Sequence, residues 1–149
     1  RLKQSGFGYL QNSVWISPDP VPEDLEILGR EIAGVEFLTC FDCLTRNPET
    51  DIRIVRASWP FEAIHEQYER CRKVLMDFPG PGFGTASQRQ ALLNWAKAEQ
   101  AAWKSVIEVD PFLPAALLPT GYLGRDVWRL RGEVLRQAGE AIHGLGFAS

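Results

Sequence analysis

The sequence predicts an α+β protein in which a short mixed part precedes a purely helical part. Two observations predict this division. Up to about residue 57, short apolar runs rich in β-branched and aromatic residues alternate with turn residues, which is typical of strands. From residue 58 onward, apolar residues recur at three- and four-residue spacing over long stretches, which is typical of amphipathic helices. We therefore expect one domain at residues 1–57 and a helical domain at residues 58–149.

The first part of the chain has the pattern of a helix end followed by a hairpin. Arg1–Gly6 resembles the last turn of a helix with its glycine cap, so we expect that a preceding segment has been removed. Phe7–Gln11 and Ser13–Ser17 are short β-type runs separated by Asn12. This arrangement predicts an antiparallel hairpin.

Residues 18–57 predict one further helix and two further strands. The prolines at 18, 20 and 22 lead into an acidic helix start, and residues 23–33 carry apolar positions at helical spacing before Gly34. Residues 35–44 are mostly apolar, which predicts a buried strand. Residues 46–51 predict a turn, and Ile52–Val55 predicts a short strand.

The second part predicts three long helices. The first carries an apolar stripe of Phe61, Ile64, Tyr68, Cys71 and Leu75. The second opens with a capping box at Thr85–Gln88, and the third begins near Arg125. Glu99 interrupts the otherwise apolar stripe of the second helix. Between the second and third helices, three prolines among paired leucines predict a rigid, irregular segment that packs on the core.

Composition and charge exclude several classes of protein. The net charge of −3 argues against a non-specific nucleic-acid surface, which needs clustered lysine and arginine. No apolar run reaches membrane-spanning length, and no secretory leader begins the chain. Three cysteines without a dense framework favour a reducing compartment, so we expect a cytoplasmic protein.

The residues that most often carry metal or catalytic chemistry do not form a convincing site. Cys40 and Cys43 have C-x-x-C spacing, but a regular strand directs them to opposite faces, so buried apolar packing is favoured over a zinc or redox role. Cys71 and His65 lie out of phase on one helix. His65 and His143 have no nucleophile at a suggestive spacing. We therefore predict neither catalytic residues nor metal ligands.

Three residues are candidates for binding a small effector. Glycines at 80, 82 and 84 precede a helix, as in phosphate loops, although a simple helix-breaking linker is the favoured interpretation because no strand precedes them. If the amides of residues 85–88 hold an anion, Arg89 is placed to assist them. The chain also has five tryptophans, most of which belong in the core. We select Trp95 and Trp59 as the aromatic candidates for a pocket.

Several motifs follow one another along the chain: Gly6-Phe-Gly8, Val14-Trp-Ile-Ser-Pro18, Trp59 and Tyr68 around a helix start, Asp110-Pro-Phe-Leu-Pro114, Leu117-Leu-Pro119 and Gly124. In this order they resemble the PaaX family of bacterial transcriptional repressors, typified by the regulator of phenylacetate degradation. Each motif alone is unspecific, but together they span nearly the whole chain. The chain departs from the family at Tyr122-Leu123, where Trp-Pro is usual.

The resemblance implies a winged helix that binds the operator, a ferredoxin-like middle domain and a helical C-terminal domain. Residues 1–57 then correspond to a truncated ferredoxin-like subdomain without its first strand and most of its first helix, and residues 58–149 to the helical domain. The winged helix lies outside this sequence, so operator DNA is expected to be bound by a segment absent from it. The resemblance implies a homodimer, no enzymatic activity and no membrane partner. No cofactor is expected other than an aryl-acyl-CoA effector such as phenylacetyl-CoA.

Two alternatives from other classes remain. Ferredoxin-like domains also resemble small CRISPR-associated, metal-dependent nucleases, whose metal-binding Asp ends a first strand that is absent from this sequence. The other alternative is an interaction domain that dimerises without sensing a ligand. A nuclease assay with magnesium distinguishes the first alternative from a repressor region. Thermal stabilisation by a ligand distinguishes a sensing domain from the second alternative.

Overall fold

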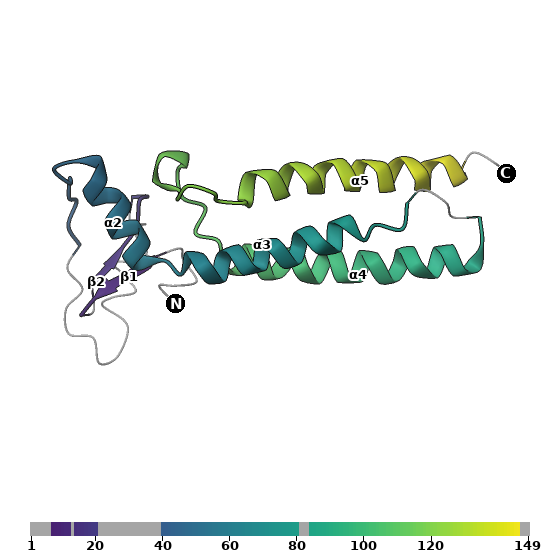
Figure 1. The fold of residues 1–149 in the computed structure, drawn as a ribbon, viewed down its shortest axis with the longest axis horizontal. Helices are drawn as coiled ribbons and strands as arrows, with labels where there is room; N and C mark the ends of the chain where they lie inside the picture. Colours follow the sequence, from purple (N-terminus) through teal and green to yellow (C-terminus); the bar gives the residue numbers. More distant parts are fainter. Residues whose placement is uncertain (1–6, 13, 21–39, 81–83, 147–149) are drawn as a thin grey trace. The chain divides into compact units, whose positions relative to one another are not determined.

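The computed structural model describes residues 7–12, 14–20, 40–80 and 84–146 (Figure 1). In chain order the elements are β1 (Gly8–Gln11), β2 (Val14–Ile16), α2 (Pro48–Ser58), α3 (Phe61–Met76), α4 (Ala86–Val109), the 3-10 helix η2 (Ala115–Leu117) and α5 (Gly124–Gly146). This is an α+β chain, as the sequence predicts. The helices predicted at residues 1–6 and 23–33 lie outside the described residues, as does most of the strand predicted at 35–44.

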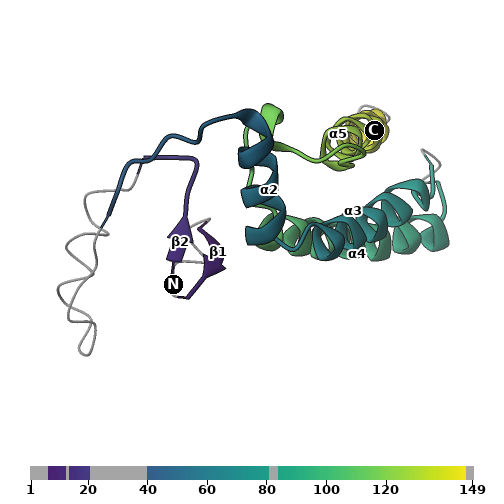
Figure 2. The ribbon, with the colours of Figure 1, turned by 60° about the vertical axis from the view of Figure 1, so that its left-hand side comes forward.

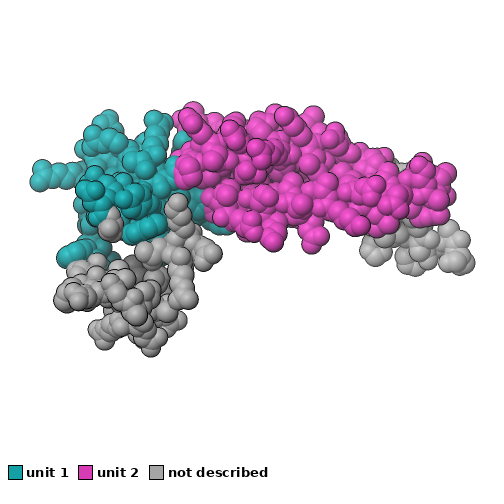
Figure 3. All heavy atoms as spheres, turned by 90° about the horizontal axis from the view of Figure 1, so that it is seen from below, with its two compact units in different colours: residues 1–59, 111–119 teal, residues 60–110, 120–149 magenta. Residues whose placement is uncertain are grey.

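The chain divides into two compact units (Figure 3). Unit 1 contains residues 1–59 and 111–119, and unit 2 contains residues 60–110 and 120–149. The first boundary falls close to the change of sequence pattern at residue 57. The proline-rich segment 111–119 groups with unit 1, although the chain on both sides of it belongs to unit 2.

The hairpin of unit 1 confirms the prediction for its two strands. β1 and β2 pair antiparallel, with Gly8 opposite Ile16 and Tyr9 opposite Trp15. The rings of this second pair meet edge to face with centroids 5.2 Å apart, a contact that stabilises neighbouring strands. Asn12 follows with φ of 42°, a left-handed conformation that asparagine adopts more readily than most residues.

The strand predicted at Ile52–Val55 is wrong, because these residues lie within helix α2. The signals for a helix start outweigh the strand-like alternation of Ile and Arg. The Asn47 side chain accepts a hydrogen bond from the Thr50 amide at 2.9 Å, and Pro48 occupies the first turn. Val55 and Ser58 are buried at helical spacing. What reads as a turn is therefore an N-terminal cap.

The described end of the other predicted strand, residues 40–44, is not a strand either. Phe41 and Leu44 are 82% and 99% exposed, and Cys40 and Cys43 are exposed as well. The prediction that these two cysteines pack as buried apolar residues is therefore wrong. For Cys71, which is fully buried, the same prediction is confirmed.

Gly8 allows the hairpin to approach the end of α2. A Cβ atom at this position would lie 2.7 Å from Cε2 of Trp59 and 2.8 Å from Cβ of Ser58. We expect Gly8→Ala to destabilise unit 1 by about 1–3 kcal/mol, because the added methyl group overpacks a closed contact. Urea unfolding followed by circular dichroism measures the loss. Gly84→Ala is the control, since its Cβ would meet only the Gln88 side-chain oxygen, at 3.9 Å; equal losses in both variants would contradict the expectation.

Unit 2 is built from three helices, with α3 packed along both α4 and α5 (Figures 1 and 2). The predicted stripe of α3 is confirmed for four of its five members, while Phe61 is only half-buried. α4 begins with the predicted capping box, in which Thr85 and Gln88 exchange hydrogen bonds. The core residues contributed by α4 and α5 are Trp95, Trp103, Val106, Val127, Val134 and Ala138. No helix within the described ranges is long and apolar enough to cross a membrane.

Candidate functional site

A buried carboxylate joins the helices of unit 2. Asp110 follows the last residue of α4 and is 7% exposed. Its Oδ2 accepts hydrogen bonds from the hydroxyl groups of Tyr68 on α3 and Tyr122, which lies just before α5. The indole Nε1 of Trp128 on α5 donates to the Tyr68 hydroxyl oxygen at 3.3 Å. We call these four residues the Asp110 network. It connects all three helices of the unit through polar groups that are otherwise costly to bury.

The two tyrosines of this network are hydrogen-bond donors rather than reactive groups. Burial raises the pKa of Tyr68 to about 12, and its hydrogen bond to Asp110 acts in the same direction. Burial and the same carboxylate also raise the pKa of Tyr122 above its ordinary value. Both phenols are therefore neutral at pH 7 and donate to the carboxylate. A neutral phenol held in this way is suited to fixing geometry and not to acting as a base.

Gly124 is adapted to the position of Tyr122. A Cβ atom at Gly124 would lie 2.3 Å from Cε1 of the Tyr122 ring, so only glycine permits this ring to cover the start of α5. The Tyr122 ring also contacts Tyr68 and Phe61 edge to face, with centroids 5.6 and 6.5 Å away. Tyr122 is thus held in the network by its hydroxyl group and by its ring.

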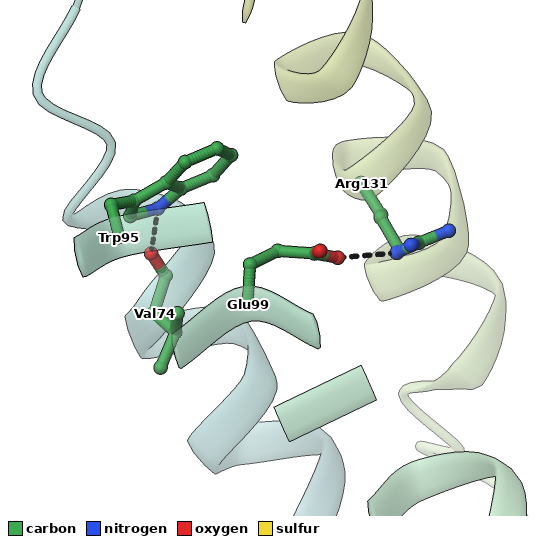
Figure 4. A network of polar contacts seen from close by, with 4 residues as sticks. All are labelled: Val74, Trp95, Glu99 and Arg131. Carbon is green, nitrogen blue, oxygen red and sulfur yellow. Dashed lines mark hydrogen bonds and ion pairs between the residues drawn. The ribbon is translucent and has the colours of Figure 1, made fainter. Parts of the chain in front are cut away.

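A second buried polar contact links α4 to α5. Nε of Arg131 donates to Oε1 of Glu99 at 2.6 Å, and the two side chains are 25% and 7% exposed (Figure 4). The Arg131 guanidinium also lies over the Trp103 ring, 4.3 Å from its centroid, and Trp103 meets Trp128 edge to face at 4.5 Å. Glu99 interrupts the apolar stripe because it is paired, and its partner lies 32 residues further along the chain.

The structure gives each candidate effector residue a place. Arg89 is exposed in the first turn of α4, and its guanidinium donates to the carbonyl oxygen of Gly84 at 3.5 Å. Trp95 is buried in unit 2, where its Nε1 donates to the Val74 carbonyl oxygen at 2.8 Å (Figure 4). Trp59 is buried in unit 1 at the end of α2. Both tryptophans therefore have internal packing roles. Ligand contact by any of the three residues stays a prediction.

Cys71 and His65 show no reactive environment. Burial, reinforced by the nearby negative charge of Glu99, raises the pKa of the Cys71 thiol to about 11, so the thiol stays protonated and unreactive. His65 is exposed on α3. Among the described residues there is no group of three or more His, Cys, Asp or Glu side chains that is able to hold a metal ion.

Taken together, these contacts describe a helical unit held together by two buried polar clusters, and a comparison with known families adds a likeness for the first part of the chain. Residues 1–55 match the family model described as the PaaX protein central Cas2-like domain. No curated protein and no solved structure matches the chain. The match agrees with the resemblance noted from the sequence: residues 1–55 are similar to the central domain of PaaX proteins.

Proposed function

We propose that this chain is the effector-sensing and dimerising region of a cytoplasmic PaaX-like repressor whose effector is an aryl-acyl-CoA such as phenylacetyl-CoA. The observation that carries the proposal is the match of residues 1–55 to the PaaX central domain. Operator DNA is contacted by the winged helix that the resemblance implies, and not by this acidic chain, whose net charge is −3. The proposal needs no metal or other cofactor.

The mechanism is a shift between two conformations. The effector binds one of them preferentially and thereby lowers the population that is competent for the operator. The backbone passes between the two units at residues 59–60, 110–111 and 119–120. Asp110 is the last residue before the change at 110–111, and Tyr122 lies shortly after the change at 119–120. The Asp110 network therefore holds both ends of the 111–119 segment, which supports its role in relaying a ligand-dependent change.

Ligand-dependent stabilisation tests the sensing role directly. Thermal unfolding of this chain is measured with increasing phenylacetyl-CoA, with acetyl-CoA and free CoA as matched ligands. We expect phenylacetyl-CoA at 100 times its Kd to stabilise the fold by about 2.7 kcal/mol, and the other two to have smaller effects. Sedimentation of the same samples measures the dimer. Sedimentation as a dimer without stabilisation by any aryl-acyl-CoA would identify a non-sensing dimerisation domain instead.

Arg89 is the first residue to test as a contact for the effector phosphates. We expect Arg89→Ala to weaken phenylacetyl-CoA binding about fivefold, the effect of one exposed charge-assisted hydrogen bond, without lowering the melting temperature. Isothermal titration calorimetry measures the affinity. Lys97→Ala, which removes another exposed cation of α4, is the control and keeps the wild-type affinity. Unchanged affinity in Arg89→Ala removes this residue from the effector site.

A second candidate function is a metal-dependent nuclease, and the observation that favours it is that the matched domain is described as Cas2-like. Incubation of the chain with single- and double-stranded DNA and RNA in Mg²⁺ or Mn²⁺ tests this candidate. We expect no cleavage. Cleavage that is lost on adding a chelator would replace the proposed regulatory role.

A further inference from the structure

Trp128 is at once exposed and held in one orientation. It is 46% exposed, whereas Trp59, Trp95 and Trp103 are each 8% exposed or less. Its Nε1 donates to Tyr68, and its ring is fixed edge to face against Trp103. A planar ring that is already immobilised loses little conformational freedom when a second ring stacks on it. Trp128 thus has the properties of a preorganised stacking surface.

The neighbours of Trp128 on α5 leave the ring accessible and supply positive charge. Helix geometry places Arg125 one turn before Trp128 and Gly132 one turn after it, and both are exposed. Side chains of a helix lean toward its N-terminus, so the Trp128 ring extends over the turn that contains Arg125. A Cβ atom at Gly132 would have nothing within 4 Å. A longer side chain at position 132 would lean over the indole, and the glycine leaves that side of the ring uncovered.

We propose that Trp128 and Arg125 form a binding site for a phosphorylated purine nucleotide, with the base stacked on the indole and a phosphate at the guanidinium. The nucleotide is either free or the end of a CoA thioester, and the second case rests on the proposed function. A ligand on a half-exposed ring keeps its other face and its edges in water. This suits a purine, whose edges bond to water, better than an aryl group, which gains most from complete burial. The phosphate complements Arg125.

The site is continuous with the Asp110 network. The indole that stacks on the base is the one whose Nε1 donates to Tyr68, and Tyr68 in turn donates to Asp110 at the end of α4. Stacking that moves the indole therefore acts on a hydrogen bond of the network. This gives the bound nucleotide a route to the point at which the chain leaves unit 2.

Gly132→Glu tests the site with little risk to the fold. The new side chain reaches back toward the indole and brings a carboxylate to the surface on which the base stacks, while glutamate is a better helix former than glycine. Gly139→Glu is the matched control, because a Cβ atom at Gly139 also has nothing within 4 Å and lies two turns further along α5. The probes are adenosine 3′,5′-bisphosphate and phenylacetyl-CoA, titrated by calorimetry and by NMR of the indole NH signals. The Trp128 signal is identified by its loss in Trp128→Phe.

We expect both probes to shift the Trp128 indole signal in the wild-type chain. Gly132→Glu should weaken both about tenfold or more, the effect of losing one base–aromatic stack, and Arg125→Ala about fivefold, while Gly139→Glu stays within about twofold of wild type. Bisphosphate binding at Trp128 without any binding of phenylacetyl-CoA supports the nucleotide site and contradicts the proposed function.

Three results would overturn the site. The first is tight phenylacetyl-CoA binding that does not respond to Gly132→Glu, with no shift of the Trp128 signal by either probe, which leaves the proposed function standing. The second is equal weakening by Gly132→Glu and Gly139→Glu, which indicates a general effect of charge. The third is a Trp128 shift with a single-stranded oligonucleotide and none with the bisphosphate, which assigns the surface to nucleic acid.

Discussion

Asp110→Ala is expected to destabilise the helical unit by about 3 kcal/mol, because it leaves the hydroxyl groups of the buried Tyr68 and the half-buried Tyr122 without their acceptor. Tyr68 is fully buried, so its hydroxyl has no access to water from which to recover a hydrogen bond. Asp110 also joins three helices, and its loss therefore affects contacts across the unit rather than at one helix end. Urea unfolding of the chain, followed by far-UV circular dichroism, measures the change in the free energy of unfolding.

Three variants serve as controls for this result. Tyr68→Phe and Tyr122→Phe each remove one donor and should cost about 1 kcal/mol, while Asp110→Asn retains an oxygen acceptor and should fall between these and Asp110→Ala. If Asp110→Ala costs no more than Tyr122→Phe, the carboxylate is not the junction of the network.

The same network has a characteristic dependence on alkaline pH. The folded pKa of Tyr68, about 12, lies above the value of about 10 for an unfolded tyrosine. Between pH 10 and pH 12 the folded state therefore binds more protons than the unfolded state. The stabilisation that Tyr68 contributes is complete below about pH 10 and is lost as the pH rises toward 12. In Asp110→Asn this window should narrow, since the carboxylate contributes to the raised pKa. Tyrosinate absorbance during a pH titration measures it.

Arg131→Met is expected to cost about 3 kcal/mol, because it leaves the Glu99 carboxylate unpaired where it is almost completely shielded from water. The variant also removes the cation from the face of Trp103. Glu99→Leu should cost less, since the Arg131 side chain is a quarter exposed and its guanidinium is able to reach water. Thermal and urea unfolding of both variants measure the difference.

The double variant Glu99→Leu/Arg131→Met distinguishes the net stabilisation by the ion pair from the cost of leaving one buried charge unpaired. We expect it to recover most of the stability, to within about 1 kcal/mol of wild type, because an apolar pair replaces both charges. The control is Arg136→Met, whose pair with Glu140 is exposed on both sides and should contribute less than about 0.5 kcal/mol. Equal losses in Arg131→Met and Arg136→Met would contradict a special role for the buried pair.

The helices of unit 2 follow from the sequence because their signals are local. The stripe of α3 and the capping box at Thr85 depend on residues three or four positions apart, and the structure confirms both. Strand prediction at Ile52–Val55 fails for a related reason. Alternating apolar residues favour a strand, but the cap at Asn47 and the proline beside it start a helix first. Residues 46–51, if interpreted as a helix start instead of a turn, would have predicted α2.

The polar networks are harder to predict, because their members meet only after the helices pack. Tyr68 and Asp110 are 42 residues apart, and Glu99 and Arg131 are 32 residues apart. The sequence does mark one partner of each pair: a tyrosine and a glutamate stand in apolar stripes, and each needs a hydrogen-bond partner once buried. Periodicity identifies neither partner. The effector likewise follows from no pattern in the sequence, so it rests on family resemblance alone.

The grouping of residues 111–119 with unit 1 has a consequence for the order in which the protein assembles during synthesis. The ribosome makes residues 60–110 before residues 111–119, so the N-terminal unit is complete only after a large part of the second unit has been made. The α3–α4 pair, which lies wholly within residues 60–110, is complete earlier. Both units gain their last parts after residue 110, and a nascent chain released at that point would contain neither unit whole.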